Sequence, residues 1–202
     1  MIFISGWAGF KTNYPELSNK YTYLTPFLLE DNLQQIEQEL ISSKAKILIG
    51  WSTGAHIILK NLENIKDNFE KIYLIAPFLY FLVDKKLKVL EIMIEAFKKD
   101  PTKVIKNFLN KAGVKTIEIE NYNEDSLLKG LAFLKNSKIN SFNPDILDDK
   151  VIIIYGEKDK IVKIDDIFKK LKNYIELKNY GHYIPEEILS EIIYETSNKK
   201  IL

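Results

Sequence analysis

The sequence predicts an α/β fold built on a mostly parallel sheet of about six strands with helices on both faces. Two patterns support this prediction: short apolar runs alternate with amphipathic segments, and most of the runs are almost continuously hydrophobic. Continuous apolar runs are typical of parallel strands, because these are buried on both faces. The strands are expected at Ile2–Ser5, Tyr21–Thr25, Lys46–Gly50, Lys71–Ala76, Val151–Tyr155 and Tyr174–Leu177.

Helical periodicity accounts for the segments between these strands. Apolar residues recur there at intervals of three and four, which places them along one face of a helix. The clearest examples are Leu33, Ile36, Leu40 and Ile41, then Ile57, Ile58 and Leu62, and finally Ile167, Phe168 and Leu171. Alternating strands and helices imply crossover connections that cover both faces of the sheet.

A helical stretch, residues 79–149, interrupts this alternation after the fourth strand. Helices are expected at Asp84–Phe97, Pro101–Ala112 and Glu124–Asn136, and the alternating segment Thr116–Glu120 could form a short edge strand. The stretch is too long for an ordinary loop. Because it follows the carboxyl end of a strand, where α/β sheets bind ligands, we interpret it as a helical cap. Residues 1–78 and 150–202 then form the predicted core.

The composition excludes several functional classes. The chain has 202 residues, of which 46% are hydrophobic, enough to bury one good core. Its 29 basic and 28 acidic side chains leave a net charge of +1, which does not favour nucleic acid as a partner. Cysteine is absent and only two histidines occur, so cysteine chemistry and multi-histidine metal sites are excluded. There is no phosphate-binding loop or dinucleotide motif, and we expect no cofactor.

Signals for targeting are also lacking. No apolar run is long enough for a membrane span. The N-terminus reads as a strand with no basic flank, unlike a signal peptide. We therefore expect a cytoplasmic protein without a membrane partner, and the sequence is compatible with a monomer.

The most informative stretch is Gly50–Gly54, which reads G-W-S-T-G. It follows the apolar run Ile47–Ile49 and precedes a helical pattern that starts at Ala55. A strand, a sharp turn carrying a serine, and a helix form the context of a nucleophile elbow. Glycines on both sides of the serine would let the helix pass close to the strand. We therefore predict that Ser52 is a nucleophile, the alternative being an ordinary turn between strand and helix.

A serine nucleophile needs a base, and the base needs an orienting group. In folds with this elbow the partners follow in the order serine, acid, histidine. His182 follows the last strand and is the predicted base, although it could be an ordinary loop histidine. His56 lies one helical turn after Ser52 and is expected to pack or face solvent. Asp159, after the strongest strand, is the predicted acid, and its nearest rival Glu157 is expected to face solvent.

The oxyanion that forms during acyl transfer needs backbone N–H donors. One is expected from Thr53, the residue after the predicted nucleophile. The second is expected from Trp7, in the turn Ser5–Gly9, where small neighbours would let the amide approach a ligand. The alternative is a tight turn in which Trp7 only packs.

The predicted cap carries apolar and basic candidates. Phe108 and Leu109 are the best candidates to line an acyl pocket, although such stripes more often belong to a core. From Lys85 to Lys115 there are nine lysines and three acidic residues, a local net charge of +6. This face is either simply solvated or a docking surface for an acidic partner. The lysines proposed for docking are Lys98, Lys99, Lys103 and Lys106.

Taken together, these motifs resemble the α/β-hydrolases, specifically the pimeloyl-[acyl-carrier protein] methyl ester esterases of biotin synthesis. The resemblance runs over most of the chain, and the tryptophan in both glycine turns is its more specific part. It is carried by Ser5–Gly9, Gly50–Gly54, Phe108–Ala112, Leu128–Leu134, Gly156–Asp159 and Gly181–His182.

This resemblance implies a shortened α/β-hydrolase fold with a helical cap. The implied enzyme is a serine carboxylesterase that removes the methyl ester from a pimeloyl chain on an acyl-carrier protein. Ser52, Asp159 and His182 would form the catalytic triad, with Trp7 and Thr53 supplying the oxyanion hole. The acidic carrier would dock on the lysine-rich cap. Substrate contacts would come from Trp7 and from Phe108, Leu109, Asn110, Lys111 and Ala112.

The chain departs from the family pattern in three respects. Ser5 stands where relatives commonly have histidine, the two usual leading strands are absent, and lysines replace the arginines expected to bind the carrier. Lysine lacks the planar fork of arginine, which bears on carrier specificity. Two other functions remain open: a general short-acyl carboxylesterase or thioesterase, and a non-catalytic binding protein. The complete set of Ser52, Asp159 and His182 argues against the second.

Overall fold

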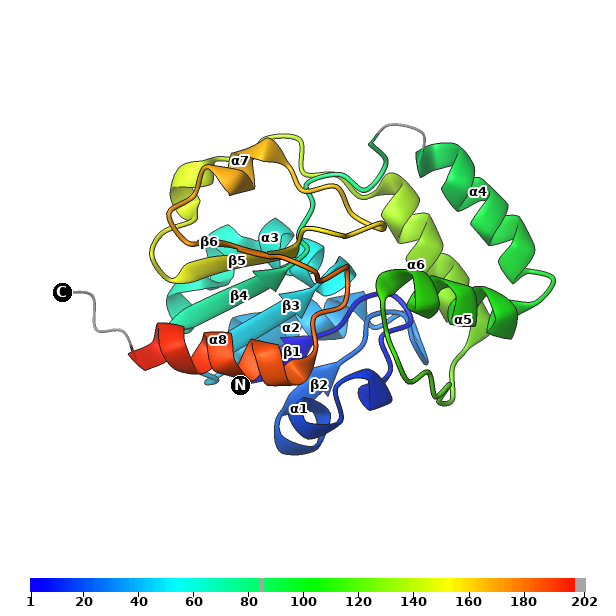
Figure 1. The fold of residues 1–202 in the computed structure, drawn as a ribbon, viewed down its shortest axis with the longest axis horizontal. Helices are drawn as coiled ribbons and strands as arrows, with labels where there is room; N and C mark the ends of the chain where they lie inside the picture. The colour runs from blue at the N-terminus through cyan, green and yellow to red at the C-terminus, as the bar shows by residue number, and fades with distance from the viewer. Residues whose placement is uncertain (84–85, 199–202) are drawn as a thin grey trace.

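The computed structural model describes residues 1–83 and 86–198. Six strands form one sheet in the order β2-β1-β3-β4-β5-β6, and every pair of neighbours is parallel (Figure 1). The predicted fold class is therefore confirmed. The strands are β1 (Ile2–Ile4), β2 (Thr22–Leu24), β3 (Ile47–Trp51), β4 (Lys71–Ile75), β5 (Val151–Gly156) and β6 (Tyr174–Leu177).

Helices cover both faces of the sheet because successive side chains of each strand point to opposite sides. On β3, Leu48 packs in a cluster with α2 (Leu33–Ser42), α3 (Thr53–Ile65) and α7 (Asp166–Lys169). The next residue, Ile49, packs in a second cluster with α1 (Pro15–Lys20) and α8 (Glu186–Asn198). The central strands are buried on both faces, which explains their continuous apolar sequences.

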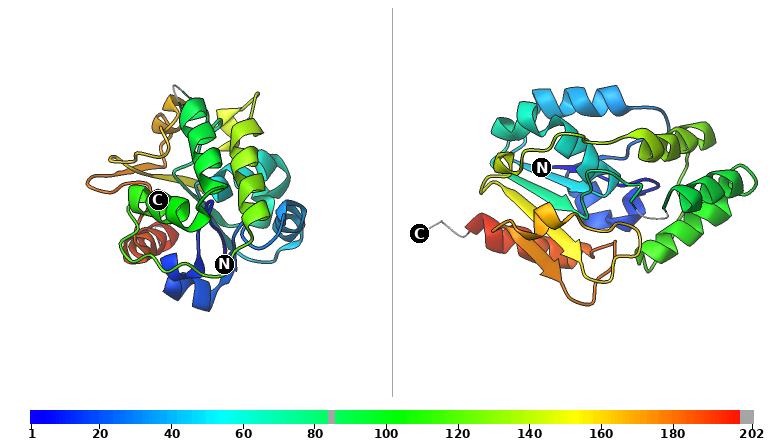
Figure 2. Two further views of the ribbon diagram at one scale, coloured as in Figure 1. Left: turned by 90° about the vertical axis from the view of Figure 1, so that its right-hand side faces the viewer. Right: turned by 90° about the horizontal axis from the view of Figure 1, so that it is seen from above.

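The helices α4 (Lys86–Phe97), α5 (Pro101–Ala112) and α6 (Glu124–Asn136) lie between β4 and β5 in the chain. We call them the cap helices. Figure 2 shows them grouped at one end of the sheet. A third apolar cluster joins them to Trp7, after β1, and to Ile161, after β5. The cap helices therefore pack on loops that follow the carboxyl ends of the strands.

Local sequence signals set the ends of the cap helices. Asp100 caps α5, since its carboxylate accepts a hydrogen bond of 3.0 Å from the backbone N–H of Lys103. Gly113 ends the same helix in the left-handed conformation, with φ of 99°. Asn123 caps α6 through the N–H of Ser126.

Thr116–Glu120 is not a strand, because its polar groups bind the turn before α1 instead of a sheet edge. The backbone N–H of Thr12 donates to the Glu120 carboxylate at 2.7 Å, and the Thr12 hydroxyl donates to the Glu118 carbonyl oxygen at 3.1 Å.

The expected start of α4 at Asp84 lies outside the described residues. Within those residues, no helix combines the length and hydropathy needed to cross a bilayer.

Candidate active site

Ser52 sits in a strained turn between β3 and α3. Its φ of 55° and ψ of −111° lie outside the regions that residues with a side chain normally adopt. Its backbone N–H donates to the carbonyl oxygen of Ile75 at 2.8 Å, which holds the turn against β4. A Cβ on Gly54 would overlap the backbone oxygen of Ile4, so only glycine allows α3 to start this close to β1. The local geometry is that of a nucleophile elbow.

His182 lies on the loop that follows β6, and Asp159 lies on the loop that follows β5; their side chains meet. The ring Nδ1 of His182 lies 2.8 Å from Oδ2 of Asp159, and both side chains are wholly excluded from solvent. The other carboxylate oxygen accepts the N–H groups of Ile161 at 2.7 Å and Val162 at 2.9 Å. Because a carboxylate can only accept, Nδ1 carries the proton and Nε2 is left with its lone pair. The carboxylate therefore fixes both the ring orientation and its tautomer.

Nε2 of His182 is buried and makes no hydrogen bond within the described residues. The ring lies beside β3, since its centroid is 5.5 Å from that of Trp51, the residue before Ser52. The structure thus brings His182 next to β3, which ends one residue before Ser52, while the hydrogen bond between Ser52 and Nε2 is not formed. Ser52 itself is only 5% exposed.

The turn after β1 lies against the elbow. A Cβ on Gly6 would come within 3.2 Å of the Ser52 Cβ, so the two turns are in contact. The backbone N–H of Trp7 donates to no group within the described residues. Thr53 is the first residue of α3, where backbone N–H groups have no partner inside the helix. Both predicted donors are therefore next to Ser52 in space or in sequence.

The side chain of Trp7 is held by the cap helices. Its indole N–H donates to the carbonyl oxygen of Leu127 at 2.9 Å. The ring of Phe108 packs edge-on against it at 5.0 Å, and that of Phe97 at 5.9 Å. Each cap helix thus contacts the turn that carries the predicted oxyanion donor.

His56 occupies a different environment from His182. Its Nδ1 lies 2.8 Å from the carbonyl oxygen of Phe78, and its Nε2 lies 2.8 Å from the hydroxyl of Ser137. The carbonyl can only accept, so Nδ1 is the protonated nitrogen and Nε2 accepts from Ser137. Burial lowers the pKa of His56 to about 4. The expected packing role fits these contacts. Glu157 is exposed, as expected.

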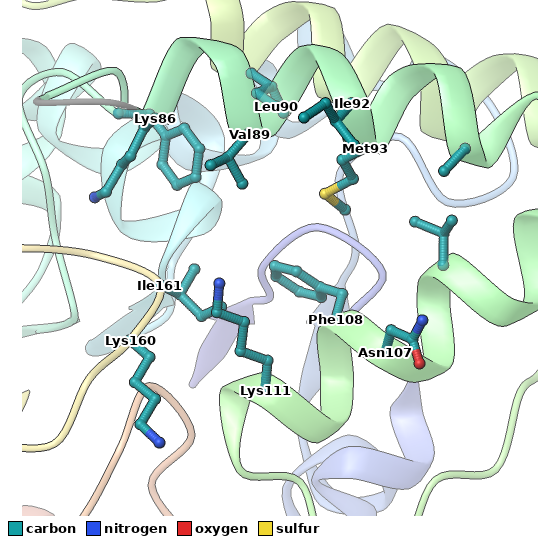
Figure 3. Close-up of a pocket in the computed structure, with 13 residues that line it drawn as sticks. Lys86, Val89, Leu90, Ile92, Met93, Asn107, Phe108, Lys111, Lys160 and Ile161 are labelled. Carbon is teal, nitrogen blue, oxygen red and sulfur yellow. The ribbon is translucent and has the colours of Figure 1, made fainter.

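A cavity of about 370 Å³ opens between α4 and α5 (Figure 3). Phe108 and Lys111, both expected to contact substrate, line it, and Met93 faces Phe108 across it. The wall continues to Lys160 and Ile161, directly after Asp159. The cavity therefore borders the loop that holds the carboxylate.

The other three expected contact residues do not line this cavity. Leu109 and Ala112 are fully buried in the cluster under the cap helices, and Asn110 is exposed. Sequence reasoning missed the opposite wall, supplied by α4. The signal was present as apolar residues at helical spacing on an exposed face: Val89, Ile92, Met93 and Ala96.

The four lysines proposed for docking are all exposed: Lys98, Lys99, Lys103 and Lys106. One of them, Lys98, forms a surface ion pair with Glu95 at 2.7 Å. Among the described residues, no group of three or more histidine, aspartate and glutamate side chains is placed to hold a metal ion.

No protein-family model matches the chain. No curated protein sequence matches it either. Several solved structures match the chain. An esterase from Thermogutta terrifontis, with malate bound, aligns with a TM-score of 0.67 at 12% identity, over 98% of this chain and 89% of its own. The α/β-hydrolase MGS-M2, from a Medee basin deep-sea metagenome library, also gives 0.67 at 12% identity, over 100% and 90% of the two chains.

A third structure, 2-hydroxy-6-oxo-6-phenylhexa-2,4-dienoate hydrolase from Rhodococcus sp. strain RHA1, aligns with a TM-score of 0.59 at 13% identity. The alignment covers 97% of this chain and 89% of that chain. At such identities the likeness shows the fold alone, which is that of the α/β-hydrolases. Function has to be argued from the site.

Proposed function

We propose that this protein is a serine carboxylesterase in which Ser52 is the nucleophile, His182 the base and Asp159 the orienting acid. One observation carries the proposal: the buried ring of His182 donates a hydrogen bond from Nδ1 to Asp159, and its Nε2 is unpaired beside β3, whose last residue directly precedes Ser52. A buried nitrogen with an open lone pair is costly unless something uses it. A serine hydroxyl that transfers its proton is the partner that the elbow offers.

In the proposed reaction, Ser52 Oγ attacks the ester carbonyl while His182 Nε2 takes its proton. The negative charge that develops on the carbonyl oxygen is stabilised by the N–H groups of Trp7 and Thr53. The carbon–oxygen bond to the leaving group then breaks as His182 protonates the departing alcohol. Water, activated by the same nitrogen, hydrolyses the acyl-enzyme and restores Ser52.

The absence of a hydrogen bond between Ser52 and His182 is compatible with this role. Catalytic hydrogen bonds are often long without substrate and tighten in the complex. The carboxylate of Asp159 is fully desolvated, so its attraction for the imidazolium that forms on proton transfer is little screened by water.

For the substrate, we propose the methyl ester of a pimeloyl chain carried on an acyl-carrier protein, with release of the carboxylate for biotin synthesis. The apolar cavity between α4 and α5 supports an acyl chain, and the lysines around the cap helices support an acidic carrier. Lys111 extends from α5 along the cavity toward Ile161 (Figure 3). Lys98, Lys99, Lys103 and Lys106 would meet the carrier as exposed point charges.

Labelling with a fluorophosphonate tests the chemical part of this proposal. Wild-type protein should be labelled once, at Ser52, and should hydrolyse p-nitrophenyl esters. Ser52→Ala should lose both properties. Ser42→Ala, which removes an exposed hydroxyl on α2, is the matched control and should retain them. Equal labelling of the Ser52→Ala variant would show that the elbow is not the nucleophile, and a wild type that is neither labelled nor active would favour a binding protein.

Hydrolysis of pimeloyl-carrier methyl ester tests the substrate. Changing Lys98, Lys99, Lys103 and Lys106 to glutamate should reduce kcat/KM on the carrier-linked ester by about tenfold or more, and spare p-nitrophenyl esters. A control set of exposed lysines away from the cap helices is Lys20, Lys44, Lys170 and Lys172. Equal losses on both substrates would contradict docking. Activity on p-nitrophenyl or thioester substrates alone would favour the general esterase or thioesterase.

A further inference from the structure

The turn Ser5–Gly9, which carries the proposed oxyanion donor Trp7, is strained. Ala8 has φ of 53°, a left-handed conformation that residues other than glycine, asparagine and aspartate seldom adopt. Such a conformation persists only where its surroundings impose it. The contacts that impose it here come from β2, the neighbouring strand.

Tyr23 is the central residue of β2 and pairs with Phe3 of β1. Its hydroxyl oxygen lies 2.9 Å from Oγ of Ser5, 3.1 Å from the carbonyl oxygen of Phe10 and 3.2 Å from that of Gly9. The phenol has one proton, so it donates to one of these three acceptors at a time. Tyr23 and Ser5 are both buried, and no solvent competes for these bonds.

Ser5 fills the space between Tyr23 and the turn. A Cβ on Gly9 would overlap the Ser5 hydroxyl, so this hydroxyl lies directly beneath the Gly9 backbone. Thr25 adds a second hydrogen bond to Gly9, from its hydroxyl to the carbonyl oxygen at 2.9 Å. The turn is thus held at its start, through Ser5, and at its end, through the carbonyl groups of Gly9 and Phe10.

We infer that Tyr23 is a positioning residue, which acts through Ser5 and the Gly9 and Phe10 carbonyls to hold the Trp7 N–H where the oxyanion forms. The inference rests on the proposed function. Trp7 lies in the middle of the held segment, and its N–H has no acceptor within the described residues. Donors of an oxyanion hole act through preorganisation, so a displacement of about 1 Å reduces the rate strongly.

The chemistry of the phenol suits this role over a wide pH range. Burial raises the pKa of Tyr23 well above its ordinary value, so the hydroxyl keeps its proton. The ring is fixed independently of the hydroxyl, because it stacks on Phe3 with centroids 5.1 Å apart. Removal of the oxygen alone should therefore leave the ring in place and release the turn.

The test is Tyr23→Phe, with Tyr21→Phe, at the residue directly before β2, as the matched control. We expect Tyr23→Phe to lower kcat for a p-nitrophenyl ester by about tenfold to a hundredfold, with KM changed by less than about twofold. Affinity for a boronic acid, whose adduct with Ser52 mimics the tetrahedral intermediate, should fall in parallel. Affinity for the product carboxylate should not. Tyr21→Phe should match wild type in all three measurements.

If thermal melting shows that Tyr23→Phe folds poorly, Ser5→Ala serves as a second variant. It should lower kcat by a smaller factor, because Tyr23 still reaches the two carbonyl groups. Unchanged kcat in folded Tyr23→Phe would overturn the inference, as would a loss of kcat without any loss of boronate affinity. A wild type that lacks esterase activity and labelling would instead overturn the proposed function itself, so the two failures are distinguishable.

Discussion

The indole N–H of Trp51 donates a hydrogen bond of 2.8 Å to the backbone carbonyl oxygen of His182. Trp51 is fully buried at the end of β3 and immediately precedes Ser52. The bond therefore joins the strand that carries the proposed nucleophile to the loop that carries the proposed base. A second bond, from the N–H of Tyr183 to the carbonyl oxygen of Ala112 at 2.8 Å, joins the same loop to α5.

Trp51→Phe should weaken both stability and turnover. Phenylalanine keeps most of the apolar contact but leaves the carbonyl oxygen of His182 buried and unpaired, at a cost of about 1–3 kcal/mol. Urea denaturation measures this cost, and kcat should fall because the His182 loop loses its tie to β3. A variant with wild-type stability and wild-type kcat would show that the bond does not position His182.

Ser52→Ala and His182→Ala should each abolish most turnover, by about four orders of magnitude in kcat. The double variant should lose little more than either single one, because the side chains act as a unit. Steady-state kinetics on one p-nitrophenyl ester measures all three. Additive losses would mean that the two residues act independently, against the proposed mechanism.

Asp159→Asn should leave the fold intact and lower kcat by about a thousandfold or more. An amide cannot stabilise the imidazolium, and its NH₂ group facing Nδ1 would favour the wrong tautomer of His182. Thermal melting separates this effect from unfolding, since the backbone N–H groups of Ile161 and Val162 can still bind an amide oxygen. If a folded Asp159→Asn variant lost less than about tenfold in kcat, Asp159 would not be the orienting acid.

Two glycine substitutions distinguish the elbow from an ordinary turn. Gly54→Ala should destabilise the protein by more than about 3 kcal/mol, because its Cβ would overlap the backbone of β1. Gly113→Ala should cost only about 1 kcal/mol, since φ of 99° is unfavourable there but nothing lies within 4 Å. Soluble yield and urea midpoints measure both. Similar small losses in the two variants would contradict the close approach of α3 to β1.

Acid should destabilise the fold through His56. Its folded pKa of about 4 lies below the ordinary value of 6.5, so between these values the unfolded chain binds a proton that the folded one does not. The contribution of His56 is present above pH 6.5 and is lost as pH falls toward 4, by about 3 kcal/mol in total. Urea midpoints of wild type and His56→Gln, compared across this pH range, measure the contribution of His56 to stability. Parallel pH dependence in both proteins would contradict it.

Much of the fold could be predicted from local sequence. Most of the strands follow from almost continuous apolar runs. Helix α5 begins and ends at Pro101 and Ala112 because an aspartate cap precedes it and a glycine follows it. The elbow could also be recognised, since a strand, a G-x-S-x-G turn and a helix are adjacent in the chain. In each case the interactions that decide the structure lie within a few residues of one another.

The sequence by itself thus determined most of the secondary structure, the class of fold and the chemical types at the candidate site. Only the tertiary structure decided that Asp159 meets His182 across 23 residues, that Trp51 ties the histidine loop across 131, and that Thr116–Glu120 binds Thr12 instead of a sheet edge. It also decided that α4 supplies one wall of the cavity and that Tyr23 reaches the turn of Trp7. The physical reason is range: periodicity and capping depend on neighbours along the chain, whereas these contacts depend on how whole strands and loops pack.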